Sequence, residues 1–467
     1  MIGQQEIERQ ATIAASLRST LAGKKALVRT FGCQQNEADG ERIAGALLSC
    51  GYTLTETLSE ADLVILNTCA VREHAEVRVL GVIGSMKKEK ERRPSMLIGM
   101  CGCMAQEAHR RQQLKASYPF VDFLFGTDMH HRVPEIISNA LESRGQKHYV
   151  SELPHDEFGE LSEGTPVQRS STYRALVTIM YGCNNFCSYC IVPYVRGRER
   201  SRSSEAVLQE VRELVQTGYR DIMLLGQNVN SYRGELSFPQ LLERCAQMDG
   251  DYWLRFMTSH PKDASDELIS VMAGNERIAR HFHLPFQSGN DRILHSMNRR
   301  YTREQYIEKA LKIKAALPDA ALTSDVIVGF PTETEAEFLE TVELVRQVEF
   351  DMLFTFLYSP RSGTKAAEME GQIPHEEQVR RFTYLSDVQN EIAQKRNDAY
   401  LGKTLRVLSD GVDTNGTPVG RSSQNKIVTF DRPVPAGQFC EVKVDTAKQY
   451  ALSGTLISNE RYGSTHE

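Results

Sequence analysis

Short apolar runs alternate with amphipathic segments along most of this chain, beginning at Lys24. Apolar positions spaced by three or four residues predict helices, and the short runs between them predict strands of a parallel sheet. In the first part of the chain the predicted strands cover 26–30, 62–67, 95–99 and 123–125. The predicted helices lie near 37–50, 73–92, 104–114 and 129–143. Residues 24–143 are therefore expected to form an α/β domain, after a polar lead that reads as a frayed helix.

A stretch without hydrophobic period, rich in Glu, Ser, Gly and Pro, follows over 144–168, and we interpret it as a linker. A second α/β series then begins. Its six predicted strands cover 175–179, 222–225, 253–257, 282–286, 322–328 and 352–357. Six units are too few for a closed eight-stranded barrel, so residues 169–397 are expected to form a partly open one. In such folds the site lies at the carboxyl ends of the strands.

The last segment, 398–461, changes to short alternating strands separated by turn signals such as Asn415-Gly416. Its predicted strands cover 405–408, 426–430, 440–444 and 451–456. This pattern predicts a small all-β barrel.

The composition is that of an ordinary globular protein, with 40% hydrophobic and 25% charged residues, and it excludes a largely disordered chain. The net charge of −6, from 55 basic and 61 acidic residues, argues against nonspecific coating of nucleic acid, so any RNA contact must be local. No run approaches the ~20 apolar residues of a membrane span. Acidic residues also stand where a signal peptide would be basic. We therefore expect a cytoplasmic protein without a membrane partner.

Ten cysteines are present, and eight of them lie before residue 191, seven of these in two groups. In a reducing compartment such groups are more often metal ligands than disulfides. One group, Cys183, Cys187 and Cys190, shares a single loop after the first strand of the second series. Three thiolates can each bind one iron of a cubane cluster and leave the fourth iron open to a ligand. A zinc site is the alternative, although zinc usually takes four ligands, and buried core cysteines are a third interpretation.

The other group, Cys33, Cys69 and Cys103, is spread along the first α/β domain. Each cysteine follows a predicted strand and precedes a predicted helix, so all three should meet at one edge of the sheet. Helix N-termini at that edge favour thiolates and an anionic cluster. The group therefore predicts a second three-cysteine cluster site, with buried cysteines at strand ends as the alternative.

The loop spacing, with an aromatic residue just before the last cysteine and a β/α barrel around it, resembles the radical S-adenosylmethionine (SAM) superfamily. With the second group in this order, the chain from about 24 to 460 is similar to the methylthiotransferases. The resemblance implies a Rossmann-like N-terminal cluster domain, a partial (β/α)6 radical SAM barrel and a C-terminal TRAM barrel associated with RNA binding. It also implies a [4Fe-4S] cluster on the loop and an auxiliary [4Fe-4S] or [3Fe-4S] cluster on the second group. The family has Gly-Gly-Cys at the third auxiliary ligand, where this chain has Cys101-Gly102-Cys103, so Cys101 is an alternative ligand.

The resemblance further implies the residues that contact SAM, most of them at strand ends: Tyr189, Arg196, Gln227, Asn228, Gln287 and Asp325. For the strand-end residues, an ordinary structural hydrogen bond is the alternative. Four arginines within 196–202 could hold the SAM carboxylate or RNA phosphates, with a solvated charge run as the alternative. The residues assigned to RNA are Arg198, Arg200, Arg202, Arg421, Lys426 and Arg432, and a second basic group that could extend this track is Arg299, Arg300 and Arg303. For this second group and for the three barrel residues, ordinary solvated surface charges are the alternative. His260 ends the third strand of the series and is as compatible with a structural as with a functional role. No side chain beyond the cluster ligands is assigned to catalysis.

Three stretches, 191–202, 225–232 and 281–289, bear on the substrate. They are more similar to methylthiotransferases acting on isopentenylated adenosine in tRNA than to those acting on threonylcarbamoyl adenosine or a ribosomal protein aspartate. The resemblance implies methylthiolation of C2 of N6-isopentenyladenosine at position 37 in the tRNA anticodon stem-loop. One SAM methylates a sulfur at the auxiliary cluster, and a second gives the radical that removes the C2 hydrogen.

As partners, the resemblance implies a reduced flavodoxin- or ferredoxin-type electron donor, and we expect a monomer. Three alternatives remain open: the threonylcarbamoyl nucleoside as substrate, a non-catalytic iron–sulfur protein that binds RNA, and a zinc-binding RNA module.

Overall fold

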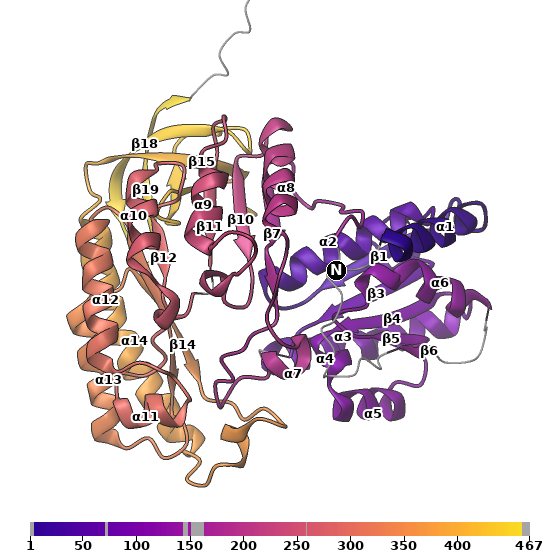
Figure 1. Ribbon diagram of the computed structural model, residues 1–467, viewed down its shortest axis with the longest axis horizontal. Coiled ribbons are helices and arrows are strands. Elements are labelled where there is room, and N and C mark those ends of the chain that lie inside the picture. The colour runs from indigo at the N-terminus through magenta and orange to yellow at the C-terminus, as the bar shows by residue number, and fades with distance from the viewer. Residues whose placement is uncertain (1–3, 71–72, 143–147, 151–162, 258, 460–467) are drawn as a thin grey trace, which may run out of the picture. The chain divides into compact units, whose positions relative to one another are not determined.

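The computed structural model describes residues 4–70, 73–142, 148–150, 163–257 and 259–459 (Figure 1). Contacts divide the chain into two compact units. The first unit comprises 1–170, 180–186 and 190–202, and the second comprises 171–179, 187–189 and 203–467. The boundary therefore passes through the cysteine loop, with Cys183 and Cys190 in the first unit and Cys187 in the second.

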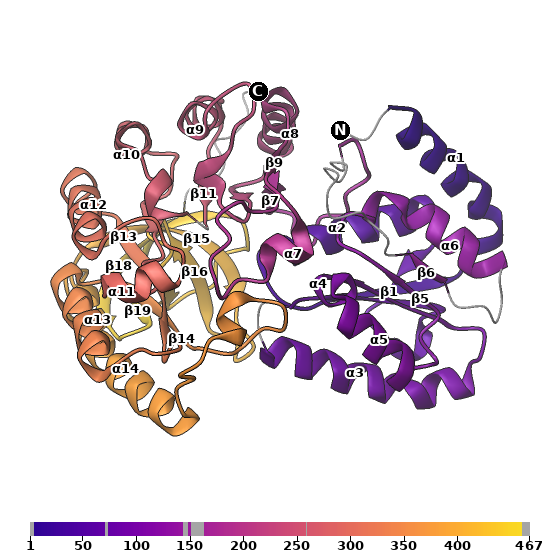
Figure 2. The ribbon, with the colours of Figure 1, turned by 60° about the horizontal axis from the view of Figure 1, so that its bottom comes forward.

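A parallel sheet forms the centre of the first unit, in the order β2-β1-β3-β4-β5-β6. Its strands are β1 (Lys25–Thr30), β2 (Thr53–Leu54), β3 (Leu63–Thr68), β4 (Leu97–Gly102), β5 (Phe123–Phe125) and β6 (His148–Val150). One face is covered by α1 (Gln4–Leu21), α2 (Gln34–Ser49) and α6 (Val133–Glu142), and the other by α3 (Glu73–Arg92) and α5 (Ala108–Ser117) (Figure 2). Helices on both faces of a parallel sheet confirm the Rossmann-like prediction.

The sequence pattern missed the two-residue strand β2 and three further features of this unit. The polar lead is an ordered helix, α1, because Ala14, Leu17 and Leu21 recur at helical spacing and pack into the core. Part of the predicted linker is the edge strand β6, which pairs in parallel with β5. Residues 143–147 and 151–162 of that linker lie outside the described residues. The helix predicted at 104–114 is two helices, α4 (Cys103–Gln106) and α5, because Glu107 adopts an extended conformation.

The second unit contains the six predicted strands of the partly open barrel, in two parallel three-stranded sheets. One sheet has the order β11 (Trp253–Phe256), β10 (Asp221–Leu225), β7 (Arg174–Thr178), and the other β12 (His281–His283), β13 (Ala321–Val328), β14 (Met352–Leu357). A single parallel bridge, Leu254 to Ile278, extends beyond β11. The helices of this series include α8 (Ser204–Gln216), α9 (Phe238–Ala246), α10 (Asp266–Gly274), α12 (Arg303–Ala316), α13 (Glu335–Val348) and α14 (His375–Asp398). Strand β12 ends earlier than predicted, and the chain turns at Gln287, which has a φ of 68°.

The C-terminal segment forms the predicted closed barrel, in the order β15-β16-β17-β19-β18. Its strands are β15 (Thr404–Val412), β16 (Pro418–Ser422), β17 (Ile427–Phe430), β18 (Phe439–Ala447) and β19 (Ala451–Asn459). The pattern missed β16, whose residues Pro-Val-Gly-Arg-Ser include only one large apolar side chain. Gly420 is required there, because a Cβ would lie 2.4 Å from the carbonyl oxygen of Leu408 on the neighbouring strand.

This barrel packs against residues at the amino-terminal part of the strands β7, β10 and β11. The rings of Trp253 and Phe439 meet edge to face, with centroids 4.8 Å apart. Arg255 donates to the carbonyl oxygens of Ser422 and Ser423, both at 3.0 Å, and pairs with Asp221 at 2.8 Å. The carboxyl ends of the strands, where a site is expected, therefore lie away from the contact with the small barrel.

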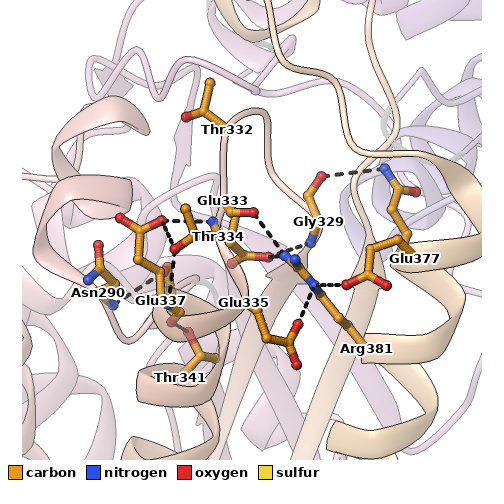
Figure 3. A network of polar contacts seen from close by, with 12 residues as sticks. Asn290, Gly329, Thr332, Glu333, Thr334, Glu335, Glu337, Thr341, Glu377 and Arg381 are labelled. Carbon is orange, nitrogen blue, oxygen red and sulfur yellow. Dashed lines mark hydrogen bonds and ion pairs between the residues drawn. The ribbon is translucent and has the colours of Figure 1, made fainter.

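A buried ion pair fixes the loop that follows β13 (Figure 3). Glu333 is 3% exposed, and its carboxylate accepts from the backbone N–H of Gly329 at 2.9 Å and from Arg381 at 3.1 Å. Arg381, on α14, also pairs with Glu377 at 2.7 Å and with Glu335 at 3.3 Å. Thr332 in this loop has a φ of 67°, which a β-branched residue rarely adopts, so the network holds a strained backbone in place.

The Glu333→Gln variant tests this network through pH. Burial raises the pKa of Glu333 to about 7, although Gly329 and Arg381 oppose the rise. Because the folded chain holds this proton more tightly than the unfolded chain, the stabilising contribution of Glu333 is present in full below about pH 4.3 and is lost as the pH rises through about 7. The melting temperature of Glu333→Gln should therefore rise relative to the unsubstituted protein across that interval, by the equivalent of at most about 4 kcal/mol. A difference in melting temperature that does not change with pH would contradict this.

Candidate functional site

The second cysteine group is brought together by three neighbouring parallel strands of the first unit. Cys33 follows β1, Cys69 follows β3, and Cys103 is the first residue of α4, directly after β4. The sheet order reverses between β1 and β3, and ligands of open α/β sheets bind at such a switch point. At Gly32 a Cβ would lie 2.4 Å from the Cβ of Cys69 and 2.8 Å from its Sγ. Glycine is thus needed for the loops of Cys33 and Cys69 to approach each other.

The donor set has the chemistry of an iron–sulfur site. Cys33 is the N-cap of α2, where a helix dipole favours a thiolate. A hydrogen bond with Cys69, and then the charge of Arg196, lower the pKa of Cys33 to about 5, whereas burial raises the pKa of Cys103. Among the described side chains, no three His, Cys, Asp or Glu residues lie close enough to share one metal ion. A cluster makes a different demand, because each cysteine binds its own iron.

Arg196 lies at this cysteine group. Its Nη2 is 2.7 Å from Asn36 Oδ1 and 2.8 Å from Asp39 Oδ2, and it also hydrogen-bonds the thiol of Cys103. Arg196 is 4% exposed and Asp39 is fully buried. The sequence prediction assigned Arg196 to SAM, whereas the structure brings it together with the auxiliary cysteines.

A web of buried polar groups surrounds this ion pair. Asn36 donates to the carbonyl oxygens of Phe31 at 2.9 Å and Thr68 at 2.8 Å, which ties the segments before Cys33 and Cys69 to one side chain. Burial raises the pKa of Asp39, but Arg196 and His130 outweigh it and hold that pKa below its usual value. Sequence analysis missed Asn36 and Asp39. The available signal was their spacing of three residues on one face of a helix that begins at a cysteine.

Two cysteines of the cysteine loop, Cys183 and Cys190, lie in the first unit, where a short hairpin holds the chain. Strand β8 (Met180–Tyr181) pairs antiparallel with β9 (Arg200–Ser201), and the backbone N–H of Cys183 donates to the carbonyl oxygen of Gly197 at 3.1 Å. Gly182 has a φ of 74°, and a Cβ there would lie 2.0 Å from the carbonyl oxygen of Arg198. Cys183 is buried and Cys190 is half-buried, so the loop presents its thiols from a fixed backbone.

In the second unit, Cys187 lies beside a buried cation that the prediction had assigned to an RNA track. Arg299 is 9% exposed, and its Nη1 is 3.4 Å from the Sγ of Cys187. Its other nitrogens donate to the carbonyl oxygen of Pro285 at 2.9 Å and to the hydroxyl of Tyr301 at 3.0 Å. Because the guanidinium of Arg299 is buried, its charge can stabilise the thiolate of Cys187 but cannot contact RNA phosphates. Tyr189, the predicted SAM contact, packs against the apolar cluster that includes Phe330.

The other predicted SAM contacts lie after β10, after β12 and in the carboxyl-terminal half of β13, all in the second unit. Asn228, after β10, is buried, donates to Asp263 at 2.9 Å and accepts from the backbone N–H of His260 at 3.0 Å. Gln287 pairs through its backbone with Asp325 and Ile327 of β13, and Gln227 is half-buried beside Asn228. Burial, and then Arg299, lower the pKa of His260 to about 2, so its imidazole is neutral. Gln227 and Asn228 follow the end of β10 as predicted, whereas Asp325 lies within β13 and Gln287 is bridged to Val326 beside it. The contacts of these residues with SAM stay a prediction.

The residues assigned to RNA separate into two kinds. Arg198 and Arg432 are exposed, and the guanidinium of Arg198 stacks 4.3 Å from the ring centroid of Phe186. The remaining four are half-buried or buried within ion pairs or hydrogen bonds: Arg200 with Asp128, Arg202 with Glu163, Arg421 with Asn425, and Lys426 with Asp351 and Asn397. The structure thus commits these four to internal contacts and leaves Arg198 and Arg432 on the surface.

A partly open β/α barrel with three cysteines in the loop after its first strand defines a radical SAM enzyme. Residues 177–345 match the Radical SAM superfamily, which implies a [4Fe-4S] cluster and SAM. Residues 25–126 match the uncharacterized protein family UPF0004, and 398–457 match the TRAM domain. The chain belongs to the family of tRNA-2-methylthio-N(6)-dimethylallyladenosine synthases.

Two relatives carry this assignment. The tRNA-2-methylthio-N(6)-dimethylallyladenosine synthase of Acetivibrio thermocellus is 46% identical over 93% of this chain and 92% of its own. That of Caldicellulosiruptor saccharolyticus is 47% identical over 92% and 91%. Among solved structures, the radical SAM methyltransferase TsrM from Kitasatospora setae is 13% identical with a TM-score of 0.54, and the match covers 74% of this chain and 77% of that one. This last likeness concerns the fold alone.

In the described part of the chain, no helix is both long and apolar enough to cross a bilayer.

The Arg196→Met variant tests the buried ion pair. It leaves the carboxylate of Asp39 buried without its main partner, so the free energy of unfolding should fall by about 3–5 kcal/mol. Arg198→Met, at an exposed arginine two residues away, is the matched control and should cost about 0.5–1 kcal/mol. Urea unfolding of both variants measures the difference. Equal losses would contradict the assignment, and Arg196→Met combined with Asp39→Leu should recover part of the stability.

Proposed function

We propose that this chain methylthiolates C2 of N6-isopentenyladenosine at position 37 of tRNA, using two SAM molecules and two iron–sulfur clusters. The observation that carries the proposal is the alignment over more than nine-tenths of the chain with relatives named for this activity. The TRAM match and the two exposed arginines support an RNA substrate.

The residues of the chain have separate roles in this proposal. Cys33, Cys69 and Cys103 hold the auxiliary cluster, with Arg196 as a fixed counter-charge beside two of the three thiols. Cys183, Cys187 and Cys190 hold the radical cluster. When bound, the clusters and SAM would supply the sulfur, the methyl group and the radical chemistry. That chemistry is required because the aromatic C–H at C2 is too weak an acid for any side-chain base.

Asn228, just after β10, and its partners are assigned to one end of SAM. Gln287, after β12, and Asp325, in the carboxyl-terminal half of β13, are assigned to the ribose. A reduced flavodoxin- or ferredoxin-type protein supplies the electron, and the chain acts as a cytoplasmic monomer. No other side chain is assigned to catalysis.

The direct test is mass spectrometry of nucleosides after anaerobic reaction of the reconstituted protein with SAM, dithionite and isopentenylated tRNA. The methylthio derivative of that nucleoside is the expected product. Release of 5′-deoxyadenosine without this product, or product only on threonylcarbamoyl adenosine, would overturn the substrate. Neither signal, with the clusters intact, would indicate a non-catalytic iron–sulfur protein.

Two neighbouring cysteines provide a matched pair of variants for the auxiliary site. Cys103→Ala removes a proposed ligand, so the auxiliary iron and the methylthio product should both be lost. Cys101→Ala removes a thiol that is fully buried in the core on the α1 side of the sheet, so iron and product should be retained. Iron analysis of the two purified variants decides between them. Loss of iron from Cys101→Ala instead would make Cys101 the ligand.

A further inference from the structure

Two phenylalanines of β14 are exposed on one face of the barrel sheet. Phe354 is 39% and Phe356 is 37% exposed, and because they are two residues apart on a strand they point to the same side. The register places Phe354 beside Asp325 and Phe356 beside Ile327 of β13. The alternate residues of β13, such as Val326 and Val328, are buried on the opposite side. The phenylalanines therefore belong to the inner face of the partial barrel and not to the face that packs on helices.

This inner face also carries polar groups from β12 and β13. Thr323 Oγ1 lies 2.9 Å from a ring nitrogen of His281 and 2.9 Å from one of His283. The second ring nitrogen of His283 lies 3.4 Å from the carboxylate of Asp325, and its ring meets that of Phe354 edge on, with centroids 5.8 Å apart. The polar groups thus contact one another, whereas each of the two phenylalanines is more than one-third exposed to solvent. Paired exposed aromatic side chains beside polar groups are typical of a binding site.

The position of the pair connects it to the expected site. Asp325, which is expected to contact SAM, is the register partner of Phe354 on the neighbouring strand β13. Gln287, the other expected contact, forms a bridge with Val326, the next residue of β13. Any molecule that reacts there must rest against the neighbouring inner-face side chains. A nucleobase with a dimethylallyl branch offers an aromatic face and five apolar carbons, and both are surfaces that phenylalanine rings cover well.

We propose that Phe354 and Phe356 form the platform that receives the modified base of the tRNA and its dimethylallyl branch. This proposal rests on the proposed function and adds the residues that select the nucleoside. The same face disfavours a threonylcarbamoyl branch, because that branch carries a carboxylate, which two phenylalanine rings cannot hydrogen-bond and the carboxylate of Asp325 repels.

The test compares binding and turnover of anticodon stem-loop RNAs that carry N6-dimethylallyladenosine, unmodified adenosine or threonylcarbamoyl adenosine at position 37. Fluorescence anisotropy with the reconstituted protein gives the binding preference, and steady-state kinetics give kcat and KM for RNA and for SAM. Phe354→Ala and Phe356→Ala should each weaken kcat/KM for the dimethylallyl RNA about ten- to hundredfold, mainly through KM. Both variants should lose the preference of the protein for this RNA over the unmodified one.

Tyr384→Ala is the matched control, since this aromatic residue of α14 is 44% exposed and packs on the ring of Phe338, on the helical side. It should change kcat/KM by less than about twofold. Phenylalanine variants that keep the binding preference and kcat/KM would overturn the platform. A rise in KM for SAM without a change for RNA would overturn it too, by assigning the rings to SAM. Failure of the proposed function is distinguishable, because the unsubstituted protein would then form no methylthio product on the dimethylallyl RNA.

Discussion

The first unit depends on a positive charge buried among cysteines. An unpaired guanidinium inside a protein costs several kcal/mol, so Arg196 requires the carboxylate of Asp39 and the amide oxygen of Asn36 beside it. Asn36 in turn holds the chain at Phe31 and at Thr68, just before Cys33 and Cys69. One ion pair therefore organises the loops of the auxiliary cysteines and draws residues 190–202, which the sequence assigns to the radical SAM core, into the first unit.

The second unit also holds a buried cation beside a cysteine, with a different set of residues. Arg299 is enclosed by backbone carbonyl and tyrosine oxygens and reaches the Sγ of Cys187, so each unit places a fixed cation beside a cysteine. The small barrel packs near the amino-terminal part of its strands, and the network of Glu333 and Arg381 fixes the loop at the carboxyl end of β13. Parallel strands direct their carboxyl ends to one side, which explains why the expected SAM contacts gather there.

Periodicity was sufficient for most of the fold, because most strands contain a short apolar run and most helices carry an apolar stripe. It failed where burial is supplied by a neighbour: β6 is stabilised by pairing with β5, and β16 by closure of its barrel. Spacing also predicted both cysteine groups, since a strand end fixes the position of a cysteine. It could not predict the partners of arginines. In the sequence, these cations cannot be told from surface cations, and only the fold shows that each has a buried oxygen partner: Arg196, Arg299 and Lys426.

The central claim is that the chain holds two independent three-cysteine cluster sites, and Mössbauer spectroscopy of the iron-enriched protein tests it most directly. The unsubstituted protein should bind about seven or eight irons in two clusters. A triple alanine variant of Cys33, Cys69 and Cys103 should lose the spectral component of the auxiliary cluster and keep that of the other cluster. The triple alanine variant of Cys183, Cys187 and Cys190 should show the converse. A folded triple variant that keeps both spectral components, or that loses both, would contradict the account.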